Sequence, residues 1–476
     1  MTLEFKNLYT SIGMLIVGCL SYLLSIESDF ALAFFSLLTL SLISYFLVSE
    51  LKKLKEGRNY ATAIVLLGIF IWYLYPAFIY SFFLDKKLYE VKLGTDIGYE
   101  DLYKSLFLIT IFSSSFVFFS GVSNENSKSL VIPLNERSNR IILIATFASI
   151  LGMLPILSSG FSVSQILELL MIGRGADKPW VHSENIGNQT SGFIYILRCF
   201  SYAGVMLILT YLFNIKDVAY KKLLISLLGV FILLVLSIDS GTRSLSMLVV
   251  LPCLTVVLHS KIRDENSLLI MLRFIMLVLF LVLLLQIQLI FRDEFTQDKD
   301  FWELFSNDIL LLGGTIDYYV ETVYSVLLVP GRHEYFLEFD LVYFTTFPIP
   351  RFIWENKPVS EIVWFYTMER WGVNIFNEGG NIFPGLVGQY YMSMGYIGPL
   401  VIGAVYAFIC NSLNKRIYNA LNVKAIYHCS LYMMYGFWLF VSFRFFSPGF
   451  LFPVLMSHLI LIISKLSFRR TGTRAY

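Results

Sequence analysis

Residues 347–398 read FPIPRFIWENKPVSEIVWFYTMERWGVNIFNEGGNIFPGLVGQYYMSMGYIG, and this stretch divides the chain into two unlike parts. It closes a long hydrophilic interval, residues 292–384, which hydrophobic runs flank on both sides. Its prolines interrupt helical structure, and two basic residues, Arg351 and Lys357, lie among them. Long loops with a composition of their own are usually functional. We therefore expect the chemistry of this protein to lie in and around this interval.

The composition of the chain is typical of a membrane protein. Of its 476 residues, 57% are hydrophobic and only 15% are charged. A soluble domain has roughly 25% charged residues. The net charge of +2 is nearly balanced and therefore gives no indication of a nucleic-acid partner. These proportions predict an all-α polytopic membrane protein.

Apolar runs of about 20 residues, the length that a helix needs to cross a bilayer, occur along most of the chain. We count about twelve of them, at 8–25, 30–49, 60–84, 104–122, 139–158, 191–213, 222–238, 244–260, 268–291, 385–411, 424–444 and 449–465. The run at 309–329 contains Asp317 and Glu321, which would be costly inside a bilayer. There we expect a helix that lies on the outer surface and packs against the spans.

The predicted spans divide the chain into three parts. Residues 1–291 contain spans one to nine, residues 292–384 form a large loop with surface helices, and residues 385–476 contain the last three spans and a basic tail. Short cytoplasmic loops collect lysine and arginine, and here the termini and the even-numbered gaps carry most of them, including those at 50–59 and 412–424. We therefore predict cytoplasmic termini and an external large loop.

Arginines occur at the predicted outer ends of several spans. Arg243 ends a short turn after span seven, Arg292 and Arg444 follow spans nine and eleven, and Arg174 lies between glycines before span six. The planar guanidinium group pairs with phosphate through two hydrogen bonds, so this pattern indicates an anionic ligand at the membrane surface. Two alternatives stay open: interfacial snorkelling for Arg292 and Arg444, and an ion pair with Asp239 for Arg243.

A reaction at a hydroxyl group also needs a carboxylate or an imidazole within hydrogen-bond reach. Glu378, beside two glycines, is the first candidate for this general base. The other candidates on the predicted outer face are Asp340, Glu355, His333, Glu334, Asp317 and His182. The sequence of this face contains no cluster of acidic, His or Cys residues with the spacing of metal ligands. We therefore expect a reaction that needs no metal and no other cofactor.

Three motifs resemble those of the Wzy-type oligosaccharide repeat-unit polymerases, the O-antigen and capsule polymerases of bacteria. They are GTRS at 241–244, PxPRFIWxxKP at 348–358, and GG…PGxxGQxYxxxGxxG at 379–398. The resemblance implies a multi-pass glycosyltransferase of the C type (GT-C-like) in the bacterial inner membrane. Its donor and acceptor would both be oligosaccharides linked to undecaprenyl diphosphate, with no nucleotide sugar and no metal. A chain-length regulator protein would be a further partner.

The resemblance also implies roles for individual residues. Arg243, Arg351 and Lys357 fall within the matching motifs and would hold diphosphate or sugar. Gln389 stands where relatives often have glutamate, so it is better suited to hydrogen bonding with the substrate than to acting as a base. Arg174, Arg292 and Arg444 come from the predicted topology and are expected to bind substrate.

Two other functions remain open on this sequence. An O-antigen ligase would share the topology and the chemistry but would use lipid A core as the acceptor. A flippase or transporter of lipid-linked sugars would need charged residues within the spans to line a cavity. In this sequence the charges gather near the predicted outer ends of spans, which favours the polymerase over the flippase.

Overall fold

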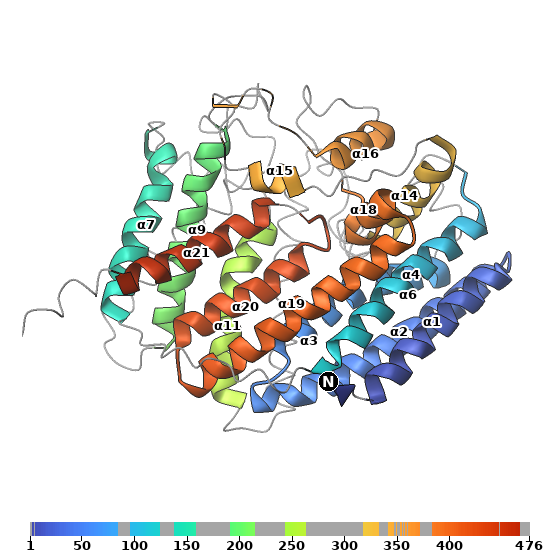
Figure 1. The fold of residues 1–476 in the computed structure, drawn as a ribbon, viewed down its shortest axis with the longest axis horizontal. Coiled ribbons are helices and arrows are strands. Elements are labelled where there is room, and N and C mark those ends of the chain that lie inside the picture. The colour runs from blue at the N-terminus through green and yellow to red at the C-terminus, as the bar shows by residue number, and fades with distance from the viewer. Residues whose placement is uncertain are drawn as a thin grey trace, which may run out of the picture.

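The computed structural model is helical almost throughout (Figure 1). It describes residues 2–3, 5–83, 96–123, 138–158, 191–214, 243–262, 318–332, 341–346, 349, 353–354, 356, 358, 360–371, 383–446 and 448–466. For some of these residues, including Arg243, it describes only the backbone. The described part of the chain also contains two short β-strands, β1 (Thr2–Leu3) and β2 (Val122–Ser123), which pair in antiparallel orientation.

Every predicted apolar run that the structure describes is mostly helical, whereas the runs at 222–238 and 268–291 lie outside the described residues. The N-terminal helices are α1 (Phe5–Leu24), α2 (Asp29–Lys53), the 3-10 turn η1 (Leu54–Glu56), α3 (Tyr60–Ile69), the π-helical turn η2 (Phe70–Leu74), α4 (Tyr75–Phe83), α6 (Tyr99–Ser120), α7 (Ser138–Ser158), α9 (Ser191–Asn214) and α11 (Arg243–Ile262).

The C-terminal half contains helices both inside and after the predicted large loop. Within residues 292–384 the structure describes α14 (Tyr318–Arg332), α15 (Leu341–Thr346) and α16 (Glu361–Trp371). After it come α18 (Gly385–Met394), α19 (Ile397–Asn422), α20 (Ile426–Val441) and α21 (Pro448–Leu466).

Six helical stretches of the described chain are long and apolar enough to cross a membrane. They are Phe5–Leu24, Asp29–Glu56, Tyr60–Ile79, Tyr99–Ser120, Ile196–Phe213 and Ile397–Asn422. Many large apolar side chains on α1, α2 and α7 are exposed, as expected for surfaces that face lipid; Leu23 on α1 is 78% exposed. The fold is therefore that of a helical membrane protein.

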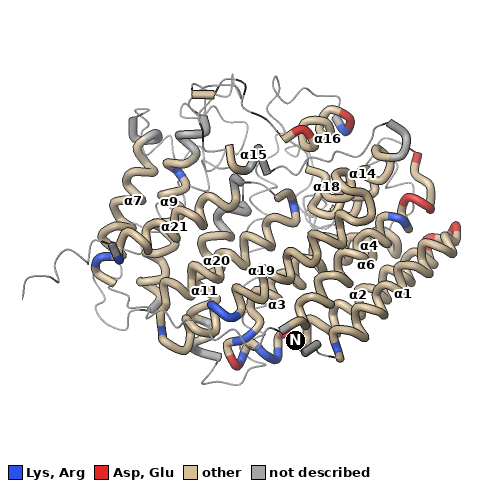
Figure 2. Tube along the Cα trace, viewed as in Figure 1, with Lys and Arg blue, Asp and Glu red and all other residues tan. Residues whose placement is uncertain are grey.

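The helices run back and forth between two ends of one bundle, and basic residues gather at one of them (Figure 2). We call this the basic end; it comprises residues 50–60, 259–262 and 415–426. Arg58 lies over the ring of Tyr418 at 5.4 Å, and the Tyr60 hydroxyl lies 2.7 Å from Nδ1 of His259. The basic segments between predicted spans at 50–59 and 412–424 therefore lie at the same end of the bundle, as the alternation of spans predicts. The side of the membrane that this end faces stays a prediction.

The opposite end, which we call the far end, comprises residues 24–29, 96–104, 383–397 and 441–446. Here the Tyr103 hydroxyl donates a hydrogen bond of 2.9 Å to the Ile26 carbonyl. In Figure 1, α14, α15, α16 and α18 all lie toward this end. The predicted surface helix near 309–329 corresponds to α14, and it is more deeply packed than a helix resting on a surface. Tyr319, Val320 and Val323 are fully buried, because α6 and α18 cover this helix.

The prediction of one span at 385–411 is wrong. The chain forms α18, which has 10 residues, then turns at Gly395, where φ is +61°, and begins α19 at Ile397. Glycine adopts this left-handed conformation readily, whereas other residues rarely do. A side chain at Gly398 would also collide with the Tyr390 carbonyl, so the two helices pack closely across the turn. Helix α19 then continues to Asn422, so most of the predicted loop at 412–424 is helical.

Candidate anion-binding site

The candidate site begins at Tyr73, in the π-helical turn that interrupts the third predicted span. Turns of this kind are frequent at functional sites because they redirect side chains within a helix. The Tyr73 side chain is fully buried, and its hydroxyl donates a hydrogen bond of 3.2 Å to the Phe443 carbonyl. The same oxygen accepts a bond of 3.1 Å from the Val387 N–H. One hydroxyl therefore connects α3–η2–α4, the start of α18 and the residues after α20.

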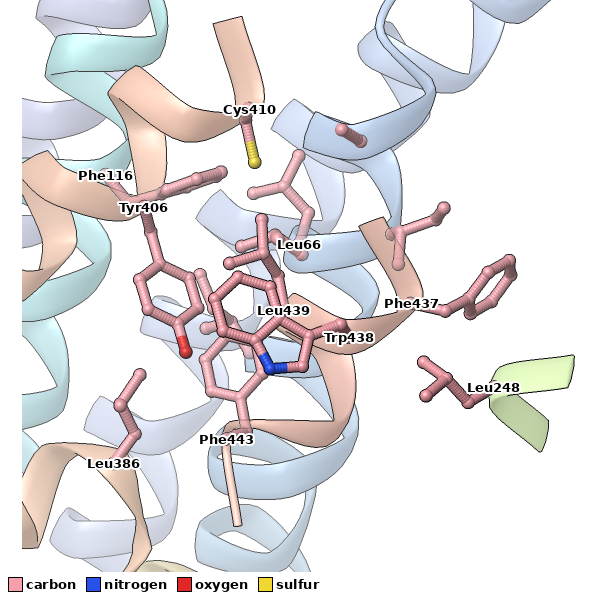
Figure 3. Close-up of a cluster of buried hydrophobic side chains, with 14 of the residues drawn as sticks. Leu66, Phe116, Leu248, Leu386, Tyr406, Cys410, Phe437, Trp438, Leu439 and Phe443 are labelled. Carbon is pink, nitrogen blue, oxygen red and sulfur yellow. The ribbon is translucent and has the colours of Figure 1, made fainter. Parts of the chain in front are cut away.

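Residues 442–446 form a turn after α20, and the bundle holds this turn at several points. The Leu386 N–H donates to the Phe443 carbonyl at 2.8 Å, and the Phe446 N–H donates to Oε1 of Gln389 at 3.3 Å. The Phe443 ring is fully buried in the cluster that also contains Tyr406 and Leu386 (Figure 3). This combination of a buried ring and backbone hydrogen bonds fixes the path of the turn.

Glycines make the close packing around this turn feasible. A Cβ atom on Gly68 of α3 would lie 2.5 Å from the Phe443 ring, so only glycine leaves space for that ring. Gly385 begins α18 with φ +72°, and a Cβ atom there would lie 3.0 Å from Cβ of Tyr318 and 3.2 Å from the Tyr73 oxygen. Glycine at both positions thus allows α18 and the turn to approach Tyr73.

Arg444 occupies the centre of the 442–446 turn. Its guanidinium carbon lies 5.0 Å from the centroid of the Phe383 ring, which in turn stacks on Phe445 at 5.0 Å. Its Nε is buried and has no hydrogen-bond partner in the part of the chain that the structure describes. Among the described residues, no carboxylate lies within 4.0 Å of this guanidinium. Arg444 is thus a half-buried cation that the described protein leaves without a counter-ion.

The surrounding backbone adds both positive and negative partial charge. The N-terminus of α18, the positive end of its dipole, contacts the turn directly through the Leu386 N–H and indirectly through the Val387 N–H, which bonds Tyr73. The C-terminus of α20, which precedes Arg444, carries an opposite partial charge of about half an elementary charge. A full cation therefore remains at the site. Because an unpaired charge is expensive in a low-dielectric environment, the arrangement favours an anionic ligand, and the guanidinium geometry suits phosphate.

The structure describes three of the residues that the sequence predicts for this site: Gln389, Arg243 and Arg444. Gln389 is 3% exposed and accepts a hydrogen bond from the Phe446 N–H, so it holds the turn two residues after Arg444. Arg243 is the first residue of α11, whose other end carries His259 at the basic end. Its backbone therefore lies toward the far end, as does Arg444. The candidates Arg174, Arg292, Arg351, Lys357 and Glu378 lie outside the described residues, as does Asp239.

The sequence did not indicate Tyr73. It lies inside an apolar run of a chain with 29 tyrosines, and no motif sets it apart. The feature that distinguishes it is the pair of backbone groups that its hydroxyl contacts, and these come from segments more than three hundred residues away along the chain, with separations of 314 and 370.

A second polar cluster joins α14 to α16 at the far end. The Tyr366 hydroxyl donates a hydrogen bond of 2.6 Å to the Glu321 carboxylate, and Arg370 Nε lies 3.7 Å from the same oxygen. The guanidinium of Arg370 also lies 5.2 Å from the Tyr324 ring. Burial, reinforced by the neighbouring Glu321 charge, raises the pKa of Tyr366 well above its usual range. Since the carboxylate has both a donor and a cation, this cluster acts as a clamp between the two helices.

Among the described residues, no three His, Cys, Asp or Glu side chains lie close enough to hold a metal ion. The independence from metal that the sequence suggests stays a prediction.

The described architecture defines a helical membrane protein with a cationic site at the far end of its bundle. Comparisons with protein-family models, curated proteins and solved structures found no match for this chain.

Proposed function

We propose that this protein is a glycosyltransferase that polymerises oligosaccharide repeat units linked to undecaprenyl diphosphate. The product is O-antigen or capsular polysaccharide, and the reaction takes place on the outer face of the bacterial inner membrane. In this proposal both termini are cytoplasmic, the chain has about twelve spans of the GT-C-like kind, and the far end of the bundle faces outward.

The observation that carries the proposal is Arg444, a half-buried guanidinium with no carboxylate partner among the described residues. It lies at the end of the bundle opposite to the basic end, and the backbone of Arg243 lies toward the same end. The three sequence motifs supply the second line of support, because they resemble those of enzymes whose substrates carry a diphosphate in a membrane. A lipid-linked substrate also fits a protein with long apolar helical faces.

The reaction that fits these features is a single displacement at an anomeric carbon. The oxygen of an acceptor sugar hydroxyl forms a bond to the anomeric carbon of the donor chain while the bond from that carbon to the diphosphate oxygen breaks. The electron pair of the broken bond leaves with undecaprenyl diphosphate, and the hydroxyl proton passes to a general base. Glu378, which Gly379 and Gly380 follow in the sequence, is the proposed base.

The arginines act on the leaving group. Negative charge on the diphosphate grows as the glycosidic bond breaks, so guanidinium groups there stabilise the transition state more than the ground state. We assign this role to Arg444, Arg243 and Arg351, while Lys357, Arg292 and Arg174 bind the remaining phosphate and sugar groups. Arginine is better suited than lysine because its planar fork forms two hydrogen bonds to one phosphate.

The test is to incubate the purified protein with a lipid-linked repeat unit and to separate the products by length. We expect a ladder of chains that differ by one repeat, and we expect it to disappear in Arg444→Ala. A ligase would form a product only when lipid A core is added, and a flippase would move the substrate across vesicles without lengthening it. Either of these results, without a ladder, would replace the proposed function.

A further inference from the structure

We infer that Tyr73 is a positioning residue for Arg444, and that its hydroxyl sets the location at which the guanidinium meets the diphosphate. This inference rests on the proposed function, because it assigns Tyr73 a role in the same site. The hydroxyl contacts no ligand in this account and acts through the backbone of the 442–446 turn.

The first step is that the Tyr73 hydroxyl acts in the site both as a hydrogen-bond donor and as an acceptor. It donates to the Phe443 carbonyl at 3.2 Å and accepts from the Val387 N–H at 3.1 Å. Phe443 is the residue directly before Arg444, and Val387 lies in the first turn of α18. The hydroxyl is therefore a bridge between α18 and the backbone that carries the arginine.

The second step is that Arg444 is held from both sides. Before it, the Phe443 carbonyl receives bonds from Tyr73 and from the Leu386 N–H, at 3.2 and 2.8 Å. After it, the Phe446 N–H donates to Gln389 at 3.3 Å. Leu386 and Gln389 both belong to α18, and Tyr406 of α19 bonds the turn at Ser442, two residues before Arg444. A change in the Tyr73 contact would therefore shift Arg444 relative to α18.

The third step is that Tyr73 differs from a buried tyrosine that serves packing alone. The Tyr103 side chain at the far end is also buried, but its hydroxyl forms a part-buried hydrogen bond, of 2.9 Å, to the Ile26 carbonyl. The Tyr73 hydroxyl instead bonds a donor, the Val387 N–H, and an acceptor, the Phe443 carbonyl, which belong to two different segments. Phenylalanine at position 73 would fill the same space, but it would leave the Val387 N–H buried without an acceptor. The chemistry of the hydroxyl, more than the volume of the ring, thus accounts for tyrosine here.

The experiment compares Tyr73→Phe with Tyr103→Phe as a matched control in full-length protein reconstituted in lipid nanodiscs. The probe is undecaprenyl diphosphate, and the first measurement is its affinity. We expect Tyr73→Phe to bind it about ten-fold more weakly, since a misplaced guanidinium loses about one charged hydrogen bond. Tyr103→Phe should stay within about two-fold of the wild type, because its hydroxyl does not touch the 442–446 turn.

A double-mutant cycle separates positioning from general stability. If Tyr73 acts only through Arg444, adding Tyr73→Phe to Arg444→Ala should cause no further loss of affinity. If Tyr73 were purely structural, Tyr73→Phe would instead weaken binding by the same factor in the wild type and in Arg444→Ala. Gln389→Met, which removes the bond on the other side of the arginine, provides a second variant with the same expected dependence on Arg444.

Hydrogen exchange of the peptide that covers residues 440–446 gives a readout independent of the ligand. We expect faster exchange in Tyr73→Phe than in the wild type or in Tyr103→Phe. The inference is overturned if Tyr73→Phe keeps wild-type affinity while Arg444→Ala loses it, or if the two losses are additive. Wild-type affinity in Arg444→Ala itself would overturn the proposed role of Arg444, and the positioning role with it.

Discussion

Arg370 and Arg444 both lie over aromatic rings at the far end of the molecule, yet among the described residues only Arg370 has a carboxylate partner. Each guanidinium lies over an aromatic ring, 5.2 Å from Tyr324 for Arg370 and 5.0 Å from Phe383 for Arg444. Arg370 lies 3.7 Å from the carboxylate of Glu321. Among the described residues, Arg444 has no carboxylate within 4.0 Å. The first charge is thus neutralised by a described residue, whereas no described carboxylate neutralises the second, which we propose pairs with a ligand.

The comparison shows that an arginine on the predicted outer face does not reveal its role by its position. Both residues come from stretches that the sequence places on the outer face. Burying a charge without a partner costs free energy, so a protein that keeps one in this state usually uses it. The carboxylate partner therefore distinguishes the structural clamp from the candidate binding group, and only the tertiary structure reveals it.

The largest effect should come from Arg444. Loss of a hydrogen bond to a charged group costs about 1.5–3 kcal/mol, so Arg444→Ala should slow polymerisation about ten- to a hundred-fold if the contact acts in the transition state. Arg444→Lys should recover little of the rate, because an ammonium group cannot form the planar fork. The measurement is the ladder of chain lengths at equal protein levels. Long chains in a stably expressed Arg444→Ala variant would contradict the assignment.

The comparison also requires that the far end faces outward. Asn356 and Asn422 are both exposed, the first in the large loop and the second at the basic end. In a Cys19→Ser background, which removes an exposed thiol, Asn356→Cys should react with an impermeant thiol reagent in intact spheroplasts. Asn422→Cys should react only after the membrane is permeabilised. The opposite pattern would place both arginines on the cytoplasmic side and remove the basis for the proposed function.

Arg370 should affect stability more than chemistry. Arg370→Ala leaves the Glu321 carboxylate without its cation, and because both side chains are partly exposed we expect a loss of about 1–2 kcal/mol in local stability. Glu321→Gln combined with Arg370→Ala should regain part of this, since no unpaired charge remains. Hydrogen exchange of residues 361–371 would measure both variants. A loss of polymerisation in Arg370→Ala with unchanged exchange would instead give Arg370 a role in the reaction.

The smallest expected effect is that of chelation. If arginines alone stabilise the diphosphate, EDTA should leave the ladder unchanged within about two-fold, because no charge at the site is removed. If EDTA abolished the ladder and Mg²⁺ or Mn²⁺ restored it, a divalent cation would also stabilise the diphosphate. In that case the unpaired state of Arg444 would need another explanation, such as interfacial snorkelling.

Much of the fold follows from the sequence alone. Composition and apolar run lengths predict a helical membrane protein, because only a helix satisfies all its backbone hydrogen bonds within one segment inside a bilayer. Apart from α14, α15 and α16 in the large loop, the described helices fall on the predicted runs, and the meeting of 50–59 with 412–424 follows from the alternation of these runs. The error at 385–411 arose because hydropathy counts apolar residues and does not register the left-handed turn at Gly395.

The candidate site depends on tertiary structure far more than the fold does. The sequence indicated that Arg444 and Gln389 matter, but not that Gln389 holds the turn on which Arg444 lies. Tyr73 and the Glu321–Arg370 clamp had no sequence signal, since each depends on contacts between segments far apart in the chain. Hydropathy and charge are properties of single residues and are readable in order along the sequence. Whether a charge is neutralised depends on what the fold places within a few ångströms of it, and only the packed helices decide that.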